Sequence, residues 1–163
     1  MKIIIVKKDT LLYDEFKFKC SIAKNGRTTK KVEGDNKTPK GLYALGPLYY
    51  RKDRFFKLST KLKKIEIKKN FGWCDDVKSK LYNKPIKINN RVRHEKLYRN
   101  DKKYDLLIPI EYNSKRPKKN KGSAIFIHLT NNYKKTKGCV AIKKKDMLIL
   151  LKLINKKTKI KII

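Results

Sequence analysis

The residues best suited to chemistry lie close together near the carboxyl end of the sequence. Cys139 directly follows Gly138, and His128 lies eleven residues upstream of Cys139, at the end of an apolar run. A thiol must lose its proton to attack a carbonyl carbon, and a nearby imidazole can take that proton. Glycine before a nucleophile lets the backbone turn sharply and lets neighbouring amides face a reacting carbonyl oxygen. These residue types predict cysteine acyl transfer, with Cys139 as nucleophile and His128 as its base.

The same residues have a plainer interpretation. A single cysteine is more often a buried apolar side chain, and a single histidine is more often a hydrogen-bonded polar residue. Lys134, Lys135 and Lys137 precede the cysteine, and their positive charge favours a thiolate. The spacing alone still leaves the structural interpretation as the commoner one.

The elements that must position this pair are mostly short strands. Alternating or continuous apolar runs predict strands within 2–8, 13–22, 42–50, 61–69, 104–110, 123–129 and 157–163. Residues 143–157 predict a helix, because their apolar positions recur at helical spacing and Asp146 falls in the first turn. Turn formers mark 25–26 and 34–41, and residues 70–87 are rich in loop formers. The predicted fold is one mainly β domain over residues 1–163, a barrel or sandwich with a helix near the C-terminus.

The net charge is the largest departure from an average composition. The formal net charge is +32, from 46 basic and 14 acidic residues, and lysines occur in nearly every segment. Nucleic-acid binding proteins more often gather their charge on one face and use arginine for bidentate contacts. The even spread favours a compositional bias toward lysine and isoleucine, so no specific nucleic-acid partner is expected. A basic module that binds nucleic acid or another anionic polymer on an inactive scaffold stays as an alternative.

The chain's location and assembly follow from simple patterns. The apolar run after Met1 is shorter than a secretory signal requires, and no stretch is long enough to span a membrane. We expect a cytoplasmic monomer if Met1 is the natural start, and a periplasmic one if a signal peptide has been removed. The three cysteines leave at least one unpaired, so reduced thiols are expected. No metal or organic cofactor is implied, because no ligand cluster is visible.

Several motifs together resemble the L,D-transpeptidase (YkuD-type) family. Residues 123–142, SAIFIHLTNNYKKTKGCVAI, resemble its catalytic segment, a strand ending in His and then Ser/Thr-x-Gly-Cys. Residues 34–43, GDNKTPKGLY, resemble its Gly-Asp-x-x-Thr-Pro-x-Gly stretch. Residues 72–86 and 94–108 resemble a compact branch in which Trp-Cys-Asp-Asp and His-Glu-x-Leu recur. The resemblance implies that Cys139 is the nucleophile, that His128 is oriented by a backbone carbonyl, and that the amides of Gly138 and Cys139 hold the oxyanion.

The resemblance also supplies candidate substrate contacts, and one departure. Many family members have a second histidine at the position of Lys137, so the way the substrate carboxylate and the acceptor are held is left open. The candidate substrate-binding residues are Trp73, Asp75, Asp76, Arg93, His94, Thr136 and Lys137. Each of the first five has a structural alternative: a capped loop with a core tryptophan, a His94–Glu95 pair behind the site, or an exposed surface arginine.

The family acts on peptidoglycan, the cell-wall polymer. Its thiolate attacks the carbonyl of an L-diamino acid in a stem peptide, expels D-alanine and forms an acyl-enzyme. Release to water is L,D-carboxypeptidase activity, release to a D-amino acid is exchange, and transfer to a second stem makes a 3-3 cross-link. The expected reaction here is release to water or a D-amino acid, acting on muropeptides in recycling, with the cross-linking transferase as the alternative. Carbapenem β-lactams are expected to acylate Cys139.

Overall fold

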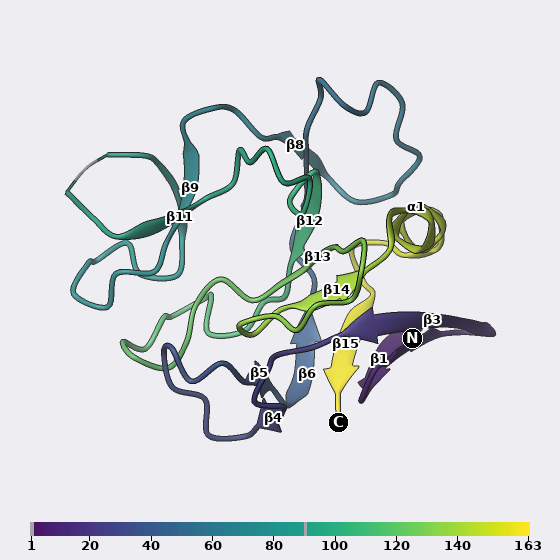
Figure 1. Cartoon of the computed structure of the whole chain (residues 1–163), viewed down its shortest axis with the longest axis horizontal. Helices are drawn as coiled ribbons and strands as arrows, with labels where there is room; N and C mark the ends of the chain where they lie inside the picture. Colours follow the sequence, from purple (N-terminus) through teal and green to yellow (C-terminus); the bar gives the residue numbers. More distant parts are fainter. Residues whose placement is uncertain (1, 90) are drawn as a thin grey trace.

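One large curled sheet forms the body of the molecule. The computed structural model describes residues 2–89 and 91–163. Ten strands lie in the order β6–β15–β1–β2–β3–β14–β13–β12–β7–β8 (Figure 1). Their bounds are β1 Ile3–Lys7, β2 Thr10–Tyr13, β3 Phe16–Ser21, β6 Gly41–Ala44, β7 Leu48–Tyr50, β8 Lys64–Glu66, β12 Leu106–Pro109, β13 Phe126–Leu129, β14 Val140–Ile142 and β15 Lys159–Ile162. The mainly β architecture predicted from the sequence is confirmed.

The first and last strands of the chain lie side by side in this sheet. β1 runs parallel to β15, with Ile3 opposite Lys159, and both termini lie at this end of the molecule (Figure 1). The strand predicted within 13–22 is present as β3, and it forms a hairpin with β2. Asp14 adopts φ 55° at the turn, a conformation that aspartate tolerates better than most residues. Because of this turn the strand begins at Phe16 and not at Tyr13, where the alternating pattern starts.

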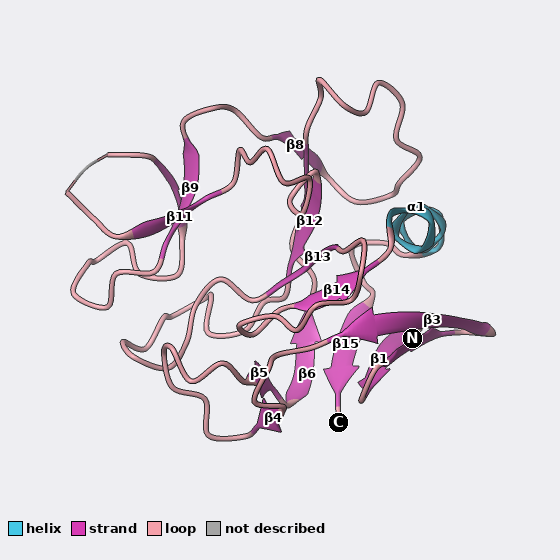
Figure 2. Cartoon of the chain, in the orientation of Figure 1, coloured by secondary structure: helices cyan, strands magenta, loops and turns pink. Residues whose placement is uncertain are grey.

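The central strands divide the protein into two faces. Alternate residues of a strand point to opposite sides of the sheet, and in β13 Ile127 and Leu129 enter a large aliphatic core. The predicted helix is present as α1, Lys144–Leu153, and it covers this core with Met147, Leu150 and Leu151 (Figure 2). The aliphatic core therefore lies on the helix side of β13.

A small sheet covers the opposite face. β9, Phe71–Cys74, lies between β10, Pro85–Lys87, and β11, His94–Lys96, away from α1 (Figures 1 and 2). The prediction of loops over 70–87 is wrong for β9 and β10. Trp73 joins this sheet to the body, since its ring lies 5.0 Å from that of Phe126 and 6.2 Å from that of Tyr49, centroid to centroid. A second, mostly aromatic cluster thus fills the space between the sheets.

A short two-stranded ladder lies apart from the two larger sheets. Residues Arg27–Thr28 (β4) and Thr38–Pro39 (β5) form a two-stranded parallel ladder that holds the loop between them.

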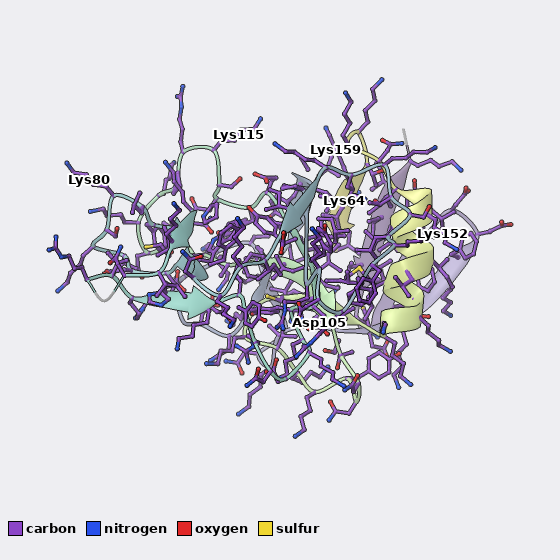
Figure 3. All side chains as sticks on the ribbon, turned by 90° about the horizontal axis from the view of Figure 1, so that it is seen from above. Lys64, Lys80, Asp105, Lys115, Lys152 and Lys159 are labelled. Carbon is purple, nitrogen blue, oxygen red and sulfur yellow. The ribbon has the colours of Figure 1, made fainter. Side chains whose placement is uncertain are left out.

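Lysine side chains point outward at opposite ends of the molecule, with Lys80 at one end and Lys152 at the end that carries α1 (Figure 3). Within the described residues, no helix is long and apolar enough to cross a membrane.

Candidate active site

Both predicted catalytic side chains line a cavity of about 1060 Å³, whose wall also includes Lys144, the first residue of α1. β13 and β14 pair in parallel, with Ile127 opposite Val140 and His128 opposite Ala141. Side chains paired in this way point to the same side, and the side alternates along each strand. His128 therefore shares a face with Ala141 and with Cys139, two residues before it. The register places the two catalytic candidates on one wall of the cavity.

The Cys139 thiol is held by the backbone. Its Sγ donates to the carbonyl oxygen of Ala124 at 3.3 Å and accepts from the amide of Phe126 at 3.4 Å. The residue is 7% exposed. Burial, with the negative charge of Glu95 as a further cause, raises the pKa of the Cys139 thiol to about 12. At neutral pH the thiol is protonated and needs a base before it can attack.

The backbone holds the His128 imidazole in one tautomer. Its Nδ1 lies 2.9 Å from the carbonyl oxygen of Leu129, and because a carbonyl only accepts, Nδ1 carries the proton. The unprotonated Nε2 is then the basic atom. Burial lowers the pKa of His128 to about 4. The resting pair is therefore a neutral thiol and a neutral imidazole, rather than a preformed ion pair.

The turn before Cys139 requires glycine because a side chain at position 138 would be too close to its neighbours. The sequence predicts a sharp turn, but Gly138 does not have a positive φ. A Cβ built on it meets Ile125 Cδ1 at 2.9 Å and the Lys37 carbonyl oxygen at 3.4 Å. Thr136 braces the same turn, since its Oγ1 accepts from the Gly138 amide at 3.2 Å and donates to the Cys139 carbonyl at 2.7 Å. The Gly138 amide, one of the two predicted oxyanion donors, is thus already bonded within the turn.

The loop at 34–41 supports this turn. Thr38 is fully buried, and its Oγ1 accepts from the Ala23 amide at 3.0 Å. Ala23 in turn forms an isolated bridge with Thr136. Asp35 holds the loop by accepting from the amide of Lys37 at 2.9 Å. The second motif of the sequence therefore fixes the backbone on which Gly138 packs.

Asn83 is a positioning residue that the sequence interpretation missed. It is 4% exposed, and its Oδ1 accepts from Trp73 Nε1 at 2.9 Å and from the Ala124 amide at 3.0 Å. Its Nδ2 donates to the carbonyls of residues 112 and 113. Ala124 has φ 53°, an unfavourable conformation for a residue with a Cβ, and its carbonyl accepts from the Cys139 thiol. Asn83 thus holds the strained carbonyl in place, although in the sequence it reads as a turn residue before Pro85.

The predicted substrate-binding residues divide into two groups. Those that line the cavity are Asp75, Arg93, His94, Thr136 and Lys137. Trp73 and Asp76 are absent from the described lining: Trp73 is a core residue, and Asp76 accepts from the Lys78 amide at 2.9 Å within its own loop. Arg93 does not present a free fork for a carboxylate, because its Nε donates to Asp75 Oδ1 at 3.1 Å.

The other cysteines lie away from this chemistry. Cys20 is 1% exposed and belongs to the aliphatic core, and Cys74 is fully buried within β9. Neither contributes to the described lining of the cavity, and all three cysteines are free thiols. The geometry therefore selects Cys139 as the thiol that a substrate can reach.

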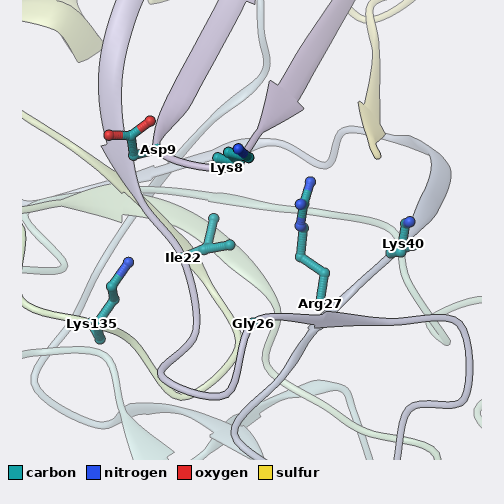
Figure 4. A pocket seen from close by; sticks show the side chains of 7 residues that line it. All are labelled: Lys8, Asp9, Ile22, Gly26, Arg27, Lys40 and Lys135. Atoms are coloured by element: carbon teal, nitrogen blue, oxygen red, sulfur yellow. The ribbon is translucent and has the colours of Figure 1, made fainter.

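A second hollow, of about 490 Å³, lies beside the β1–β2 turn. Its lining is Lys8, Asp9, Ile22, Gly26, Arg27, Lys40 and Lys135 (Figure 4). The set is mostly cationic and contains neither cysteine nor histidine. It offers positive charge but no nucleophile or base for acyl transfer.

Comparison with known proteins agrees with the fold and gives the family. The L,D-transpeptidase catalytic domain family (YkuD) matches residues 1–162. No curated protein matches the chain. The structure of Bd1075 from Bdellovibrio bacteriovorus is similar to it with a TM-score of 0.53 and 17% identity, over 99% of this chain and 47% of that one. The chain therefore spans about half the length of that protein, and the likeness is one of fold.

Proposed function

This chain belongs to the L,D-transpeptidase catalytic domain (YkuD) family, and from that premise we propose that it is a cysteine acyl-transfer enzyme acting on peptidoglycan stem peptides. The observation that carries the proposal is the placement of Cys139 and His128 on one wall of a single cavity. Each is 7% exposed, which shields the reacting atoms from bulk water while leaving an approach for a peptide.

The first half of the reaction forms a thioester. His128 Nε2 takes the proton from the Cys139 thiol as the sulfur attacks the carbonyl carbon of the L-diamino acid, and the negative charge moves to the carbonyl oxygen. The Cys139 amide donates to that oxygen. The carbon–nitrogen bond to D-alanine then breaks, and the imidazolium returns its proton to the leaving amine. Because the neutral pair is favoured at rest, charge develops only while substrate excludes water.

The second half passes the acyl group to water or to a D-amino acid. His128 removes a proton from the acceptor, the new bond to carbon forms, and the thiol is released. The cavity volume of about 1060 Å³ is just above the range of about 300–1,000 Å³ typical for one ligand. One stem peptide and a small acceptor suit that volume better than two stems do.

Incubation with a disaccharide tetrapeptide, followed by mass analysis of the products, tests this proposal. We expect a disaccharide tripeptide and free D-alanine from the unmodified protein, and neither from Cys139→Ala. Dimers without any tripeptide would show cross-linking instead and reject the small acceptor.

The dispersed charge argues against the basic binding module. Lysines project from opposite ends of the molecule (Figure 3), whereas binding to a polymer backbone favours a continuous basic face. We expect negligible retention of DNA or RNA near physiological salt, together with turnover that depends on Cys139. Tight retention by a protein without turnover would favour the binding module.

A further inference from the structure

Glu95, the carboxylate of the His-Glu-x-Leu motif, has no role in the acyl-transfer steps above, yet it lies in the cavity of the nucleophile. Glu95, on β11, lines the same cavity as Cys139, and its side chain is 32% exposed. Its Oε1 accepts from the Tyr104 hydroxyl at 2.5 Å. Tyr104 packs edge-on against His128, with ring centroids 5.3 Å apart, and also against Phe126. One buried tyrosine therefore connects Glu95 to the catalytic wall.

Without a bound cation, the Glu95 carboxylate opposes formation of the Cys139 thiolate. Burial raises the pKa of Glu95, so its ionised form is disfavoured there. Its negative charge also contributes to the raised pKa of the Cys139 thiol. In a chain with 46 basic and 14 acidic residues, a carboxylate in this place is a conspicuous exception. Until a cation binds beside it, Glu95 disfavours the Cys139 thiolate, and burial disfavours the ionised form of Glu95.

The neighbouring cations do not complete its hydrogen bonding. Arg99 is the nearest, with Nη1 3.9 Å from Glu95 Oε1, which is too long for a hydrogen bond. Its Nε and Nη2 donate to Asp101 instead. A carboxylate accepts about four hydrogen bonds, and within the described residues Tyr104 supplies the one side-chain bond to Glu95. The remaining capacity opens to the cavity.

We propose that Glu95 binds the side-chain ammonium of the diamino acid that donates the acyl group, and that this binding activates the Cys139 thiol by neutralising the charge opposite it. The inference rests on the proposed function and assigns to Glu95 the recognition of the free side-chain amine of that substrate. Linkage makes the two effects reciprocal, because a ligand that eases loss of the thiol proton binds more tightly once that proton is lost.

The reactivity of the thiol without substrate tests the electrostatic half. The charged and titratable groups that act on Cys139 or Glu95 are Glu95, Tyr104, His128, Lys31, Arg99, Lys137 and Asp75. Glu95→Gln removes one negative charge and keeps an acceptor for Tyr104. We expect Cys139 to be alkylated by iodoacetamide several-fold faster at pH 8 in this variant. Glu66→Gln, on exposed β8, makes the same charge change outside the cavity and should leave the rate unchanged.

Two tetrapeptide substrates that differ only in the side-chain amine test the recognition half. Charge-assisted hydrogen bonds contribute enough that acetylating the amine should lower kcat/KM by about 10-fold to 100-fold in the unmodified protein. Glu95→Gln should reduce this preference to nearly one. Tyr104→Phe should weaken it, because the carboxylate then loses its positioning bond. An undiminished preference in Glu95→Gln, or none in the unmodified protein, would overturn the inference.

Binding without turnover separates this inference from the proposed function. Titrating both peptides into Cys139→Ala and into Cys139→Ala/Glu95→Gln by calorimetry measures recognition alone. Tighter binding of the free-amine peptide, lost on removal of the Glu95 charge, supports the ammonium site even if the unmodified protein shows no turnover. Equal binding of the two peptides to Cys139→Ala, in a protein that does turn over stem peptides, rejects the ammonium site and leaves the proposed function standing.

Discussion

The two faces of strand β13 differ in what their side chains do, although the residues alternate along one short segment. Ile127 and Leu129 enter the aliphatic core under α1. Phe126 and His128 point the other way: Phe126 packs in the cluster around Trp73, and His128 lines a cavity that also holds a thiol, a tyrosine and a carboxylate. Both faces are buried, so burial alone does not distinguish them. The difference shows that one face forms a rigid, packed core. The other face carries ionisable groups whose pKa values are shifted by burial.

The largest effect expected on the cavity face is that of removing the nucleophile. Cys139→Ala should lower turnover on the order of 10⁴-fold or more, because neither the oxyanion donor nor substrate binding replaces the covalent step. Its thermal stability should change little, since the thiol makes only two weak bonds. Product analysis by mass measures the first effect and calorimetry the second. Cys20→Ala is the control, and turnover that persists in Cys139→Ala would remove the chemical role of this face.

The neighbouring core residue should show the reverse behaviour. Ile127→Ala deletes a fully buried side chain from the aliphatic core and should lower the free energy of unfolding by about 2–5 kcal/mol. The kcat of the folded protein should stay within a few-fold of the unmodified value. Denaturant titration and initial rates give both numbers. A variant that keeps its stability but loses kcat would show that the two faces are not separate in function.

Because the pKa of His128 is lowered in the folded protein, the protein should lose stability at acid pH. With a pKa of about 4 folded and 6.5 unfolded, His128 binds its proton more readily in the unfolded chain between these values. Its contribution to stability is therefore full above pH 6.5 and is lost as the pH falls toward 4, by about 3 kcal/mol. Denaturant titrations across this range measure it.

The variant that tests this pH effect is His128→Gln. It should show a shallower loss of stability between pH 6.5 and 4 than the unmodified protein. Equal slopes in the two proteins would mean that His128 is not protonated more easily on unfolding.

The smallest effect expected is at the turn that joins the two faces. Gly138→Ala places a Cβ 2.9 Å from Ile125 Cδ1 and should cost about 1–3 kcal/mol, with a several-fold fall in kcat as Cys139 shifts. Ile125→Val removes that methyl group, so the double variant should recover part of both losses. If Ile125→Val gives no recovery, the Lys37 carbonyl rather than Ile125 sets the requirement for glycine.

The sequence predicts the parts of this fold that local pattern determines. β1, α1 and β15 follow from apolar spacing, and the predicted turn at Gly26 is present with φ 76°. β9 and β10 escape prediction because they are short, contain glycine and proline, and are stabilised by pairing with each other and by packing of Trp73 on Phe126. Tertiary contacts, rather than propensity, make them strands.

The site is predictable to a similar depth. Cys139, His128 and the motif at 34–41 are visible along the chain. Glu95 and Tyr104 lie in the 94–108 motif, but their contact with each other and with the cavity is not visible there, because it depends on the pairing of β11 with β9 and on the packing of Tyr104 against Phe126. The role of Asn83 is hidden in the same way, since its four partners are distant in sequence or belong to the backbone.

Covalent labelling tests the central claim, that Cys139 is the reactive thiol of the cavity face, most directly. A carbapenem incubated with the unmodified protein should open its β-lactam ring and form a thioester on one cysteine. Peptide mapping by mass spectrometry should place that adduct on Cys139, with Cys20 and Cys74 unmodified because both are buried away from the cavity. An adduct on Cys20 or Cys74, with Cys139 unmodified, would contradict the account.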